Sequence, residues 1–444
     1  MKILVVSGFF PPYAPVSGSR VNKLARFLEL QGHDIRVLAP LRRDQGSSLT
    51  PEISEDKIIF TDFTDINAFP SYIKQSVKSI FSSKENDNLA EQSEQYGEDK
   101  SETGEESKLS LYYRKLTNIP DRTIGWYPKA ISEGRKLFKS WSPDIIFTTV
   151  PPFTCLLVAS KLARINDVPW VADYRDLWSD HGYYHGSGFK KKIDRFIEKR
   201  ALSNCSGLIT VTQSWVETLK KSRNIPVQLA MNGFDPSDFE GIVEKELYPD
   251  HLTILYAGAL YEGKRDPQKL FEAMAKLGDA AKKIKVLLYT EFGVDELSES
   301  QKKIIRDHEL EEQVICSKYI PQSELHKIMA GTDIMMLLRW DDPRENSVIA
   351  GKLFEYIGTG KPILSIGGTE GEAADIIRDN NFGLVSNDVD EIAGYLKTQL
   401  QSKKSSKESC NPNQKKFERS AQFEKLEKFM QDIVNRTKLE NMSN

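Results

Sequence analysis

The chain has 444 residues, a formal net charge of −3 and a pI near 6.2. Its length favours two domains over one. The basic residues are scattered among acidic ones and form no stripe, so the composition argues against a nucleic-acid partner.

The N-terminal residues show the pattern of a β-α-β unit. An apolar strand over Ile3–Ser7 is followed by a glycine- and proline-containing loop, a helix-spaced stretch beginning at Val21, and a second strand over Ile35–Leu38. The first apolar run is too short for a secretory signal, and no stretch approaches the roughly 20 apolar residues of a membrane span. We therefore expect a cytoplasmic protein, or one peripheral at the inner membrane face.

Residues 82–110 are acidic and polar, with almost no large apolar side chains. Such a segment cannot bury enough surface to offset the entropy of ordering. It is predicted to be a disordered insertion without a catalytic role.

Strands then alternate with helices in two series, and this alternation predicts parallel sheets covered on both faces. The expected organisation is two Rossmann-like α/β domains facing each other across a cleft. The predicted bounds are residues 1–232 for an acceptor-side domain, 233–410 for a nucleotide-sugar-binding domain, and 411–444 for a helix that packs back on the first domain, followed by a flexible tail. Ligands in such sheets bind beyond the carboxyl ends of the strands.

In the second series, Glu355 is expected near the start of a helix that points toward the cleft. A carboxylate there can accept hydrogen bonds from the hydroxyls of a ribose, and the helix start can bind a diphosphate. The alternative is a solvated Glu355, with Gly358 and Gly360 ending the helix. The run Gly358–Lys361 lacks the spacing of a P-loop, which argues against ATP hydrolysis.

In the first series, Asp173, Arg175 and Asp176 follow a buried strand. They could orient an acceptor hydroxyl or form a structural ion-pair network. His181 lies in a tyrosine- and glycine-rich loop that either lines the acceptor site or has no role. Gly18 either lets the backbone approach a ligand at a helix start or belongs to a plain turn.

Five segments together resemble glycosyltransferase family 4 of the GT-B fold. In the C-terminal half they are "LYAGALYEGKRDP", "MNGFDPSDF" and "GKLFEYIGTGKPIL". In the N-terminal half they are the loop and helix from "FFPPYAPVSGSR" onward, and "PWVADYRDLW", which is similar to the bacterial polysaccharide-forming branch.

The resemblance implies a retaining transferase that moves a sugar from a nucleotide-sugar donor to a saccharide or a lipid-linked saccharide, in cell-surface polysaccharide or glycan assembly. It assigns Glu355 to the ribose, and Lys264 with Arg265 to the diphosphate. It implies no cofactor and no metal, so the pair Asp341-Asp342 is interpreted as a solvated acidic loop. The residues expected at the site are, as catalytic groups, Asp173, Lys264 and Glu345; around the donor, Gly18, Lys264, Arg265, Ser347, Lys352, Leu353 and Glu355; and on the acceptor side, Arg175, Asp176 and His181.

One departure from the family pattern concerns the sugar. The family has two glutamates seven residues apart, and Ser347 stands where the first would be. Its role would pass to Glu345, to Ser347 or to backbone. The alternatives to a transferase are a nucleotide-sugar 2-epimerase of the same fold and a catalytically silent nucleotide-sugar-binding subunit.

Overall fold

A computed structural model describes residues 1–14, 18–42, 49–66, 117–184, 188–261, 263–403 and 411–443. The predicted insertion at 82–110 lies outside these residues. The chain divides into two compact units. Unit 1 comprises Met1–Thr210, Thr218–Gln228 and Leu426–Asn444, and unit 2 comprises Val211–Glu217 and Leu229–Lys425.

Unit 1 is built on a parallel sheet. Among the described residues, seven strands lie in the order β3-β2-β1-β4-β5-β6-β7. They are β1 (Lys2–Ser7), β2 (Asp34–Leu41), β3 (Ile58–Asp62), β4 (Ile145–Val150), β5 (Trp170–Tyr174), β6 (Gly207–Thr210) and β7 (Val227–Leu229). Strands β1, β4, β5 and β6 are apolar and almost wholly buried, as expected for strands covered on both faces.

The helices of this part of the chain are α1 (Ser19–Leu30), α4 (Tyr127–Leu137), α5 (Thr154–Asn166), α6 (Gly188–Ala201), α7 (Gln213–Ser222) and the C-terminal α14 (Arg419–Ser443). The end of α14 packs on the sheet of unit 1. A Cβ on Gly207 of β6 would come within 2.6–2.7 Å of Ile433 and Phe429, so only glycine allows this close approach.

Unit 2 is a second parallel sheet. Its described strands lie in the order β10-β9-β8-β11-β12-β13. They are β8 (Leu252–Ala257), β9 (Ile284–Thr290), β10 (Val314–Lys318), β11 (Ile334–Leu338), β12 (Ile363–Ile366) and β13 (Gly383–Val385). The helices are α8 (Gln268–Leu277), α9 (Glu299–Asp307), α10 (Gln322–Ala330), α11 (Gly351–Thr359), α12 (Glu372–Asp379) and α13 (Val389–Ser402).

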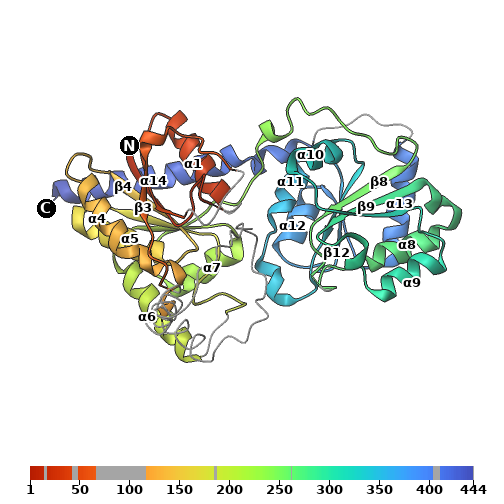
Figure 1. The fold of residues 1–444 in the computed structure, drawn as a ribbon, viewed down its shortest axis with the longest axis horizontal. Coiled ribbons are helices and arrows are strands. Elements are labelled where there is room, and N and C mark those ends of the chain that lie inside the picture. The colour runs from red at the N-terminus through yellow and green to blue at the C-terminus, as the bar shows by residue number, and fades with distance from the viewer. Residues whose placement is uncertain are drawn as a thin grey trace, which may run out of the picture. The chain divides into compact units, whose positions relative to one another are not determined.

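Alternate residues of these strands enter two separate hydrophobic clusters, one on each face of the sheet. Leu255 and Met335 pack with α10, α11 and α12, whereas Ile254 and Ile334 pack with α8, α9 and α13. Figure 1 shows these two groups of helices on opposite sides of the unit 2 sheet. The predicted α/β class with two Rossmann-like domains is therefore confirmed.

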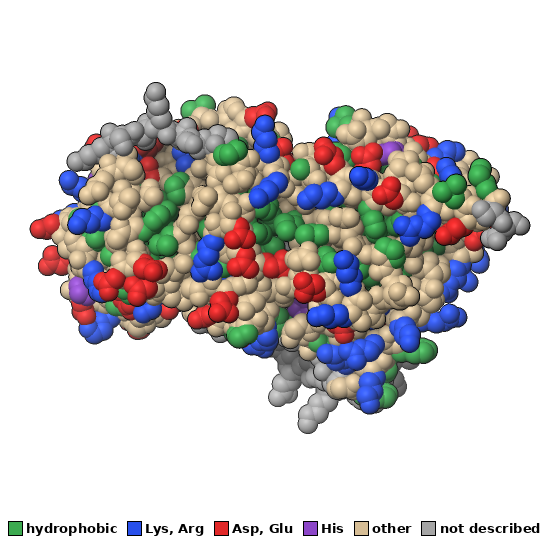
Figure 2. All heavy atoms as spheres, turned by 180° about the vertical axis from the view of Figure 1, so that it is seen from behind, with side chains coloured by type: hydrophobic (Ala, Val, Ile, Leu, Met, Phe, Trp, Pro, Cys, Tyr) green, Lys and Arg blue, Asp and Glu red, His purple; other side chains and the backbone are tan. Residues whose placement is uncertain are grey.

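Acidic and basic side chains are mixed over most of the surface seen in Figure 2, in keeping with the scattered charges of the sequence. Within the described residues, no helix is both long enough and apolar enough to span a bilayer.

Candidate functional site

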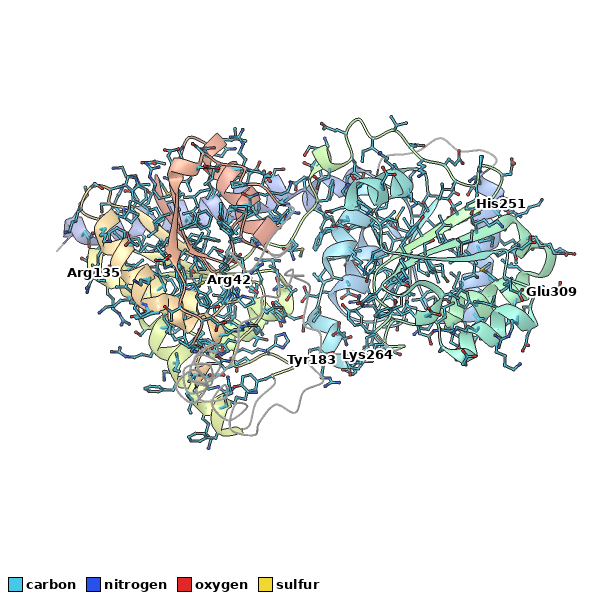
Figure 3. The ribbon with its side chains drawn as sticks, in the orientation of Figure 1. Arg42, Arg135, Tyr183, His251, Lys264 and Glu309 are labelled. Carbon is cyan, nitrogen blue, oxygen red and sulfur yellow. The ribbon has the colours of Figure 1, made fainter. Side chains whose placement is uncertain are left out.

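The strand order of unit 2 creates a switch point between β8 and β11. From β8 the chain proceeds to β9 on one side, and β11 pairs with β8 on the other. Loops leaving two such strands diverge and form a crevice at their carboxyl ends. The loop after β8 carries Lys264 and Arg265, and the loop after β11 leads to Glu345, Ser347 and α11. Lys264 follows β8 and His251 precedes it, and Figure 3 shows these two residues at opposite ends of unit 2.

Gly258, immediately after β8, makes room for Lys352 of α11. Its φ of +151° is one that residues with a side chain rarely adopt, and a Cβ there would overlap the Lys352 ammonium group. Lys352 Nζ lies 4.9 Å from the centre of the Tyr256 ring on β8. The absence of a side chain at Gly258 thus lets the Lys352 ammonium group of α11 lie close to the backbone of the loop after β8.

The environment of Lys352 favours loss of its proton. Burial, together with the nearby Arg265 guanidinium, lowers the pKa of Lys352 to about 8, although the charges of Glu355 and Glu296 oppose this shift. The Arg265 guanidinium also lies 4.5 Å from the Tyr261 ring centre. Lys352 and Arg265 therefore lie close together, and neither forms an ion pair within 4 Å with an acidic residue in the described part of the chain, which favours the binding of an anion.

Glu355 is the fifth residue of α11, in its middle turn, and not near its start as the sequence predicted. Its carboxylate accepts no hydrogen bond from a described residue. Burial raises the pKa of Glu355, and the charges of His326, Lys352 and Arg419 oppose this effect. A half-buried carboxylate without a donor retains the capacity to accept hydrogen bonds from a ligand.

Trp340 connects the loops that follow β8 and β11. Lys264 Nζ lies 4.7 Å and the Arg344 guanidinium 5.3 Å from its ring centre. Arg344 is itself held by Asp342 through two hydrogen bonds of 2.8 and 2.6 Å. Asp342 also caps the 3₁₀ turn Pro343–Ser347, and these hydrogen bonds from Arg344 lower the pKa of Asp342 to about 2. Lys264 is exposed.

Glu345 and Ser347 lie on this 3₁₀ turn, and Leu353 lies buried in α11. The Glu345 charge acts on Arg339, which is buried at the end of β11. Arg339 donates hydrogen bonds to the carbonyls of Gly368 and Glu370 after β12. Arg339 thereby ties the loop after β12 to the end of β11.

Glu296, which the sequence interpretation missed, organises the loop after β8. Its carboxylate accepts hydrogen bonds from the backbone N–H of Leu260 in that loop, and from those of Glu291 and Phe292 after β9. A carboxylate that joins two loops through backbone donors has no local motif, so no sequence signal identifies it. Trp340 was also missed, because its ring contacts with Lys264 and Arg344 follow no local sequence motif.

In unit 1, Asp173 lies in a buried ion pair. Its two oxygens accept hydrogen bonds of 3.1 and 3.2 Å from Arg20 of α1, and Thr149 of β4 adds a third of 3.0 Å. Asp173 is 1% and Arg20 5% exposed. Of the two alternatives left open by the sequence, this geometry favours the ion-pair network, because a buried, fully bonded carboxylate cannot contact a substrate.

The other residues expected in unit 1 lie at the carboxyl ends of its strands. Arg175 donates a hydrogen bond of 2.8 Å to the Pro151 carbonyl, and Asp176 is exposed. His181 Nδ1 accepts from the Tyr183 N–H at 3.0 Å. Gly18 begins α1 with an ordinary φ of −75°, and a Cβ there would collide with Ala14, so its role in the structure is close packing.

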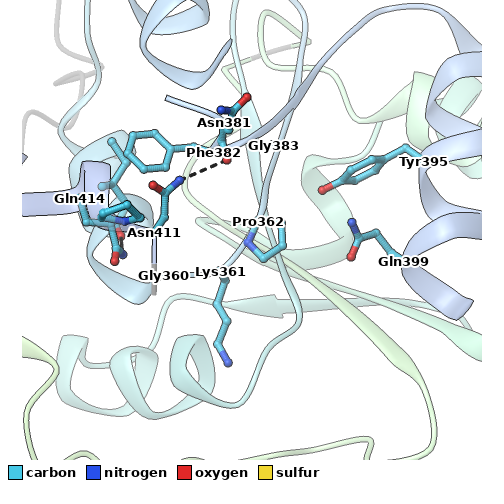
Figure 4. Close-up of a pocket in the computed structure, with 12 residues that line it drawn as sticks. Gly360, Lys361, Pro362, Asn381, Phe382, Gly383, Tyr395, Gln399, Asn411 and Gln414 are labelled. Atoms are coloured by element: carbon cyan, nitrogen blue, oxygen red, sulfur yellow. Dashed lines mark hydrogen bonds between the residues drawn. The ribbon is translucent and has the colours of Figure 1, made fainter. Parts of the chain in front are cut away.

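A cavity of about 500 Å³ lies elsewhere in unit 2 (Figure 4). Its walls include Pro362 and Gly383, which are at the amino ends of β12 and β13, and Tyr395 and Gln399 of α13. The cavity therefore lies at the edge of the sheet opposite the Lys264 and Glu355 site. Among the described side chains, no three His, Cys, Asp or Glu residues come together as a metal site.

Two protein-family models match the chain. The Glycosyl transferase 4-like domain matches residues 90–232, and Glycosyl transferases group 1 matches residues 238–417, a range that contains all the unit 2 site residues above. Both models describe glycosyltransferases, and the chain is a glycosyltransferase with a group 1 domain. The predicted transferase class is thus confirmed, and the protein transfers a sugar from a nucleotide-sugar donor.

Solved structures show the same fold. Sucrose-phosphate synthase from Thermosynechococcus elongatus is 12% identical with a TM-score of 0.60, and 98% of this chain and 100% of that chain are covered. HepE of Anabaena in complex with UDP is 13% identical with a TM-score of 0.59, and 97% of this chain and 100% of HepE are covered. The lipopolysaccharide outer core galactosyltransferase WaaB is 13% identical with a TM-score of 0.51, covering 96% and 98%. No curated protein matches the sequence.

Proposed function

We propose that this glycosyltransferase retains the configuration of a sugar that it transfers from a uridine diphosphate donor, and that unit 2 binds the donor. One observation carries the proposal: the cations Lys264, Arg265 and Lys352 and the carboxylate of Glu355 gather at the switch point of the unit 2 sheet. HepE, which has the same fold, is reported in complex with UDP and with UDP-glucose, and this supports uridine as the base.

Each group has a role that its chemistry suits. Glu355 accepts hydrogen bonds from the ribose hydroxyls, and Lys264, Arg265 and Lys352 neutralise the diphosphate. Negative charge grows on the diphosphate as the glycosyl–phosphate bond breaks. Fixed cations aimed there stabilise the transition state more than the ground state.

In the proposed step, the acceptor hydroxyl oxygen forms a bond to the anomeric carbon. The bond from that carbon to the diphosphate oxygen breaks, and its electron pair leaves with UDP. The hydroxyl proton passes to the departing diphosphate. Attack from the face that UDP leaves gives retention, and exclusion of water prevents hydrolysis of the oxocarbenium-like centre.

The remaining residues are assigned to the sugar and the acceptor. Glu345, Ser347 and Leu353 of unit 2 are proposed to contact the transferred sugar or hold its loop. On the acceptor side, the exposed Asp176, together with Arg175 and His181, is proposed to bind a saccharide or a lipid-linked saccharide of cell-surface polysaccharide assembly. Asp173 and Gly18 act by positioning α1.

Acceptor-dependent release of UDP tests the proposal. The protein is incubated with each of a panel of UDP-sugars, with and without saccharide acceptors, and UDP and glycoside products are measured. We expect UDP release to require an acceptor and to fall at least 100-fold in Glu355→Ala and Lys264→Ala, while Lys269→Ala on the outer face of α8 is unchanged. Wild-type rates in both site variants, isomerisation of the sugar without an acceptor, or donor binding without turnover would each overturn it.

A further inference from the structure

Helix α6 of unit 1 presents an exposed face that contains aromatic and basic side chains but no acidic ones. Phe189 and Phe196 are 75% and 71% exposed, although large apolar side chains on a helix usually face the core. The exposed charged residues of α6 are all cations, namely Lys192, Arg195, Lys199 and Arg200. This exposed face of α6 therefore combines two phenylalanines with four positive charges.

The six residues lie on one side of the helix. At about 100° per residue, Phe189, Lys192, Arg195, Phe196, Lys199 and Arg200 fall within an arc of about 140°. Figure 2 shows Lys and Arg side chains with apolar ones among them at the lower right, where the view of Figure 1, turned round, has α6. The arrangement is a continuous surface, because residues three, four and seven apart are neighbours on a helix.

The acidic residues of α6 point the other way. Asp194 and Glu198 are 0% and 2% exposed. Asp194 accepts hydrogen bonds of 2.6 Å from Tyr184 and from Lys190. Glu198 accepts from Tyr174 at 3.1 Å and forms an ion pair of 3.0 Å with Arg223. Because these carboxylates are buried and paired, they do not neutralise the exposed cations. Arg195 forms an ion pair with Asp180 at 2.9 Å, and the other three exposed cations form none with the residues that the structure describes.

We propose that the exposed face of α6 docks on an anionic lipid bilayer. A helix that lies in a membrane interface has basic residues beside aromatic or aliphatic ones on its outer face, and this pattern matches α6. The four cations are attracted to anionic headgroups, and the two phenyl rings enter the boundary between headgroups and acyl chains. The net charge of the whole chain is −3, so the attraction must be local to this face.

Such docking would hold unit 1 at a membrane surface, where a lipid-linked acceptor is found. The proposal does not depend on the donor assignments in unit 2. Binding to vesicles needs no turnover, so failure of the membrane proposal and failure of the proposed transferase function are distinguishable.

Flotation with lipid vesicles tests the proposal on the full chain. The probes are vesicles of pure phosphatidylcholine and vesicles with about 30% phosphatidylglycerol, at low and high salt. We expect binding to the anionic vesicles alone, weakened by salt. Lys192→Glu/Lys199→Glu removes two attractive charges, each worth about a fivefold change in partitioning, and should weaken binding at least about 25-fold. Phe189→Ser/Phe196→Ser should weaken it about tenfold or more.

Matched variants separate a local face from general charge. Lys397→Glu/Lys428→Glu makes the same charge change on exposed lysines of α13 and α14, and Phe292→Ser removes an exposed ring in unit 2. Both should bind vesicles like the wild type. No binding to anionic vesicles, equal loss in the control charge variant, or capture of single-stranded RNA in place of vesicles by the same α6 residues would overturn the proposal. Unchanged melting temperatures exclude unfolding as the cause of any loss.

Discussion

Gly258→Ala tests the contact between the loop after β8 and α11. A Cβ at position 258 would overlap the Lys352 ammonium group and lie 2.9 Å from its Cε. The group it meets is the far end of a flexible side chain, so the clash is relieved by moving Lys352 and not by moving the backbone. The variant should therefore displace the cation while leaving unit 2 folded.

Two costs follow from the geometry. A side chain at φ +151° costs about 1–3 kcal/mol of folding stability. Displacing Lys352 removes a hydrogen bond to a charged group, worth about 1.5–3 kcal/mol, which corresponds to about a 10- to 150-fold weaker complex with the donor diphosphate.

Calorimetric titration with UDP and thermal unfolding measure these two costs separately. Gly278→Ala is the matched control, since Gly278 has φ +55° and open space where its Cβ would be. It should lose stability but keep its affinity for UDP. Gly258→Ala with wild-type affinity for UDP, or with a loss no larger than that of Gly278→Ala, would refute the role given to Lys352.

Three further predictions concern single charged groups. UDP affinity should fall by up to about tenfold as the pH rises through about 8, because Lys352, whose pKa is lowered mainly by burial to about 8, must be protonated to bind the diphosphate. Titrations at pH 7, 8 and 9 should show that the Lys352→Arg variant lacks this fall. An identical fall in that variant would contradict the assignment. Asp173→Asn should lower the free energy of unfolding by about 3–5 kcal/mol, since it leaves Arg20 buried without a counter-charge. An unchanged melting temperature with a reduced kcat would instead favour a direct catalytic role for Asp173. Glu296→Ala should weaken UDP binding about tenfold, because it releases the loop after β8. Glu299→Ala, at an exposed position, is the control and should bind UDP like the wild type. A loss of stability in Glu296→Ala without weaker UDP binding would contradict this positioning role.

The sequence predicts most strands of both sheets because their residues are continuously apolar. Strands β3 (Ile58–Asp62), β7 (Val227–Leu229) and β10 (Val314–Lys318) escaped prediction. Each is short and at the edge of its sheet, and β10 ends in Cys316, Ser317 and Lys318, which lack the apolar character of a buried strand. Edge strands bury less of their surface, so their residues need not be apolar and the strands are harder to recognise in the sequence.

The candidate site was predictable only in part. Glu355 and Lys264 follow strands of unit 2 in the order that the family resemblance implies, so the sequence could indicate them. Their neighbours could not be inferred, because the contact of Lys352 with Gly258 joins residues 94 positions apart, as 352 − 258 gives. For Asp173, the sequence indicated a site residue but could not reveal that Arg20 already donates two hydrogen bonds to its carboxylate.

The central claim is that the switch point of unit 2 binds the nucleoside diphosphate of the donor. Comparing the affinities of UDP and uridine for the wild type and for Lys264→Ala/Lys352→Ala tests it most directly. We predict that UDP binds the wild type at least 100-fold more tightly than uridine, and that the double variant loses most of this difference while its affinity for uridine is kept. An equal preference for UDP in both proteins would contradict the claim.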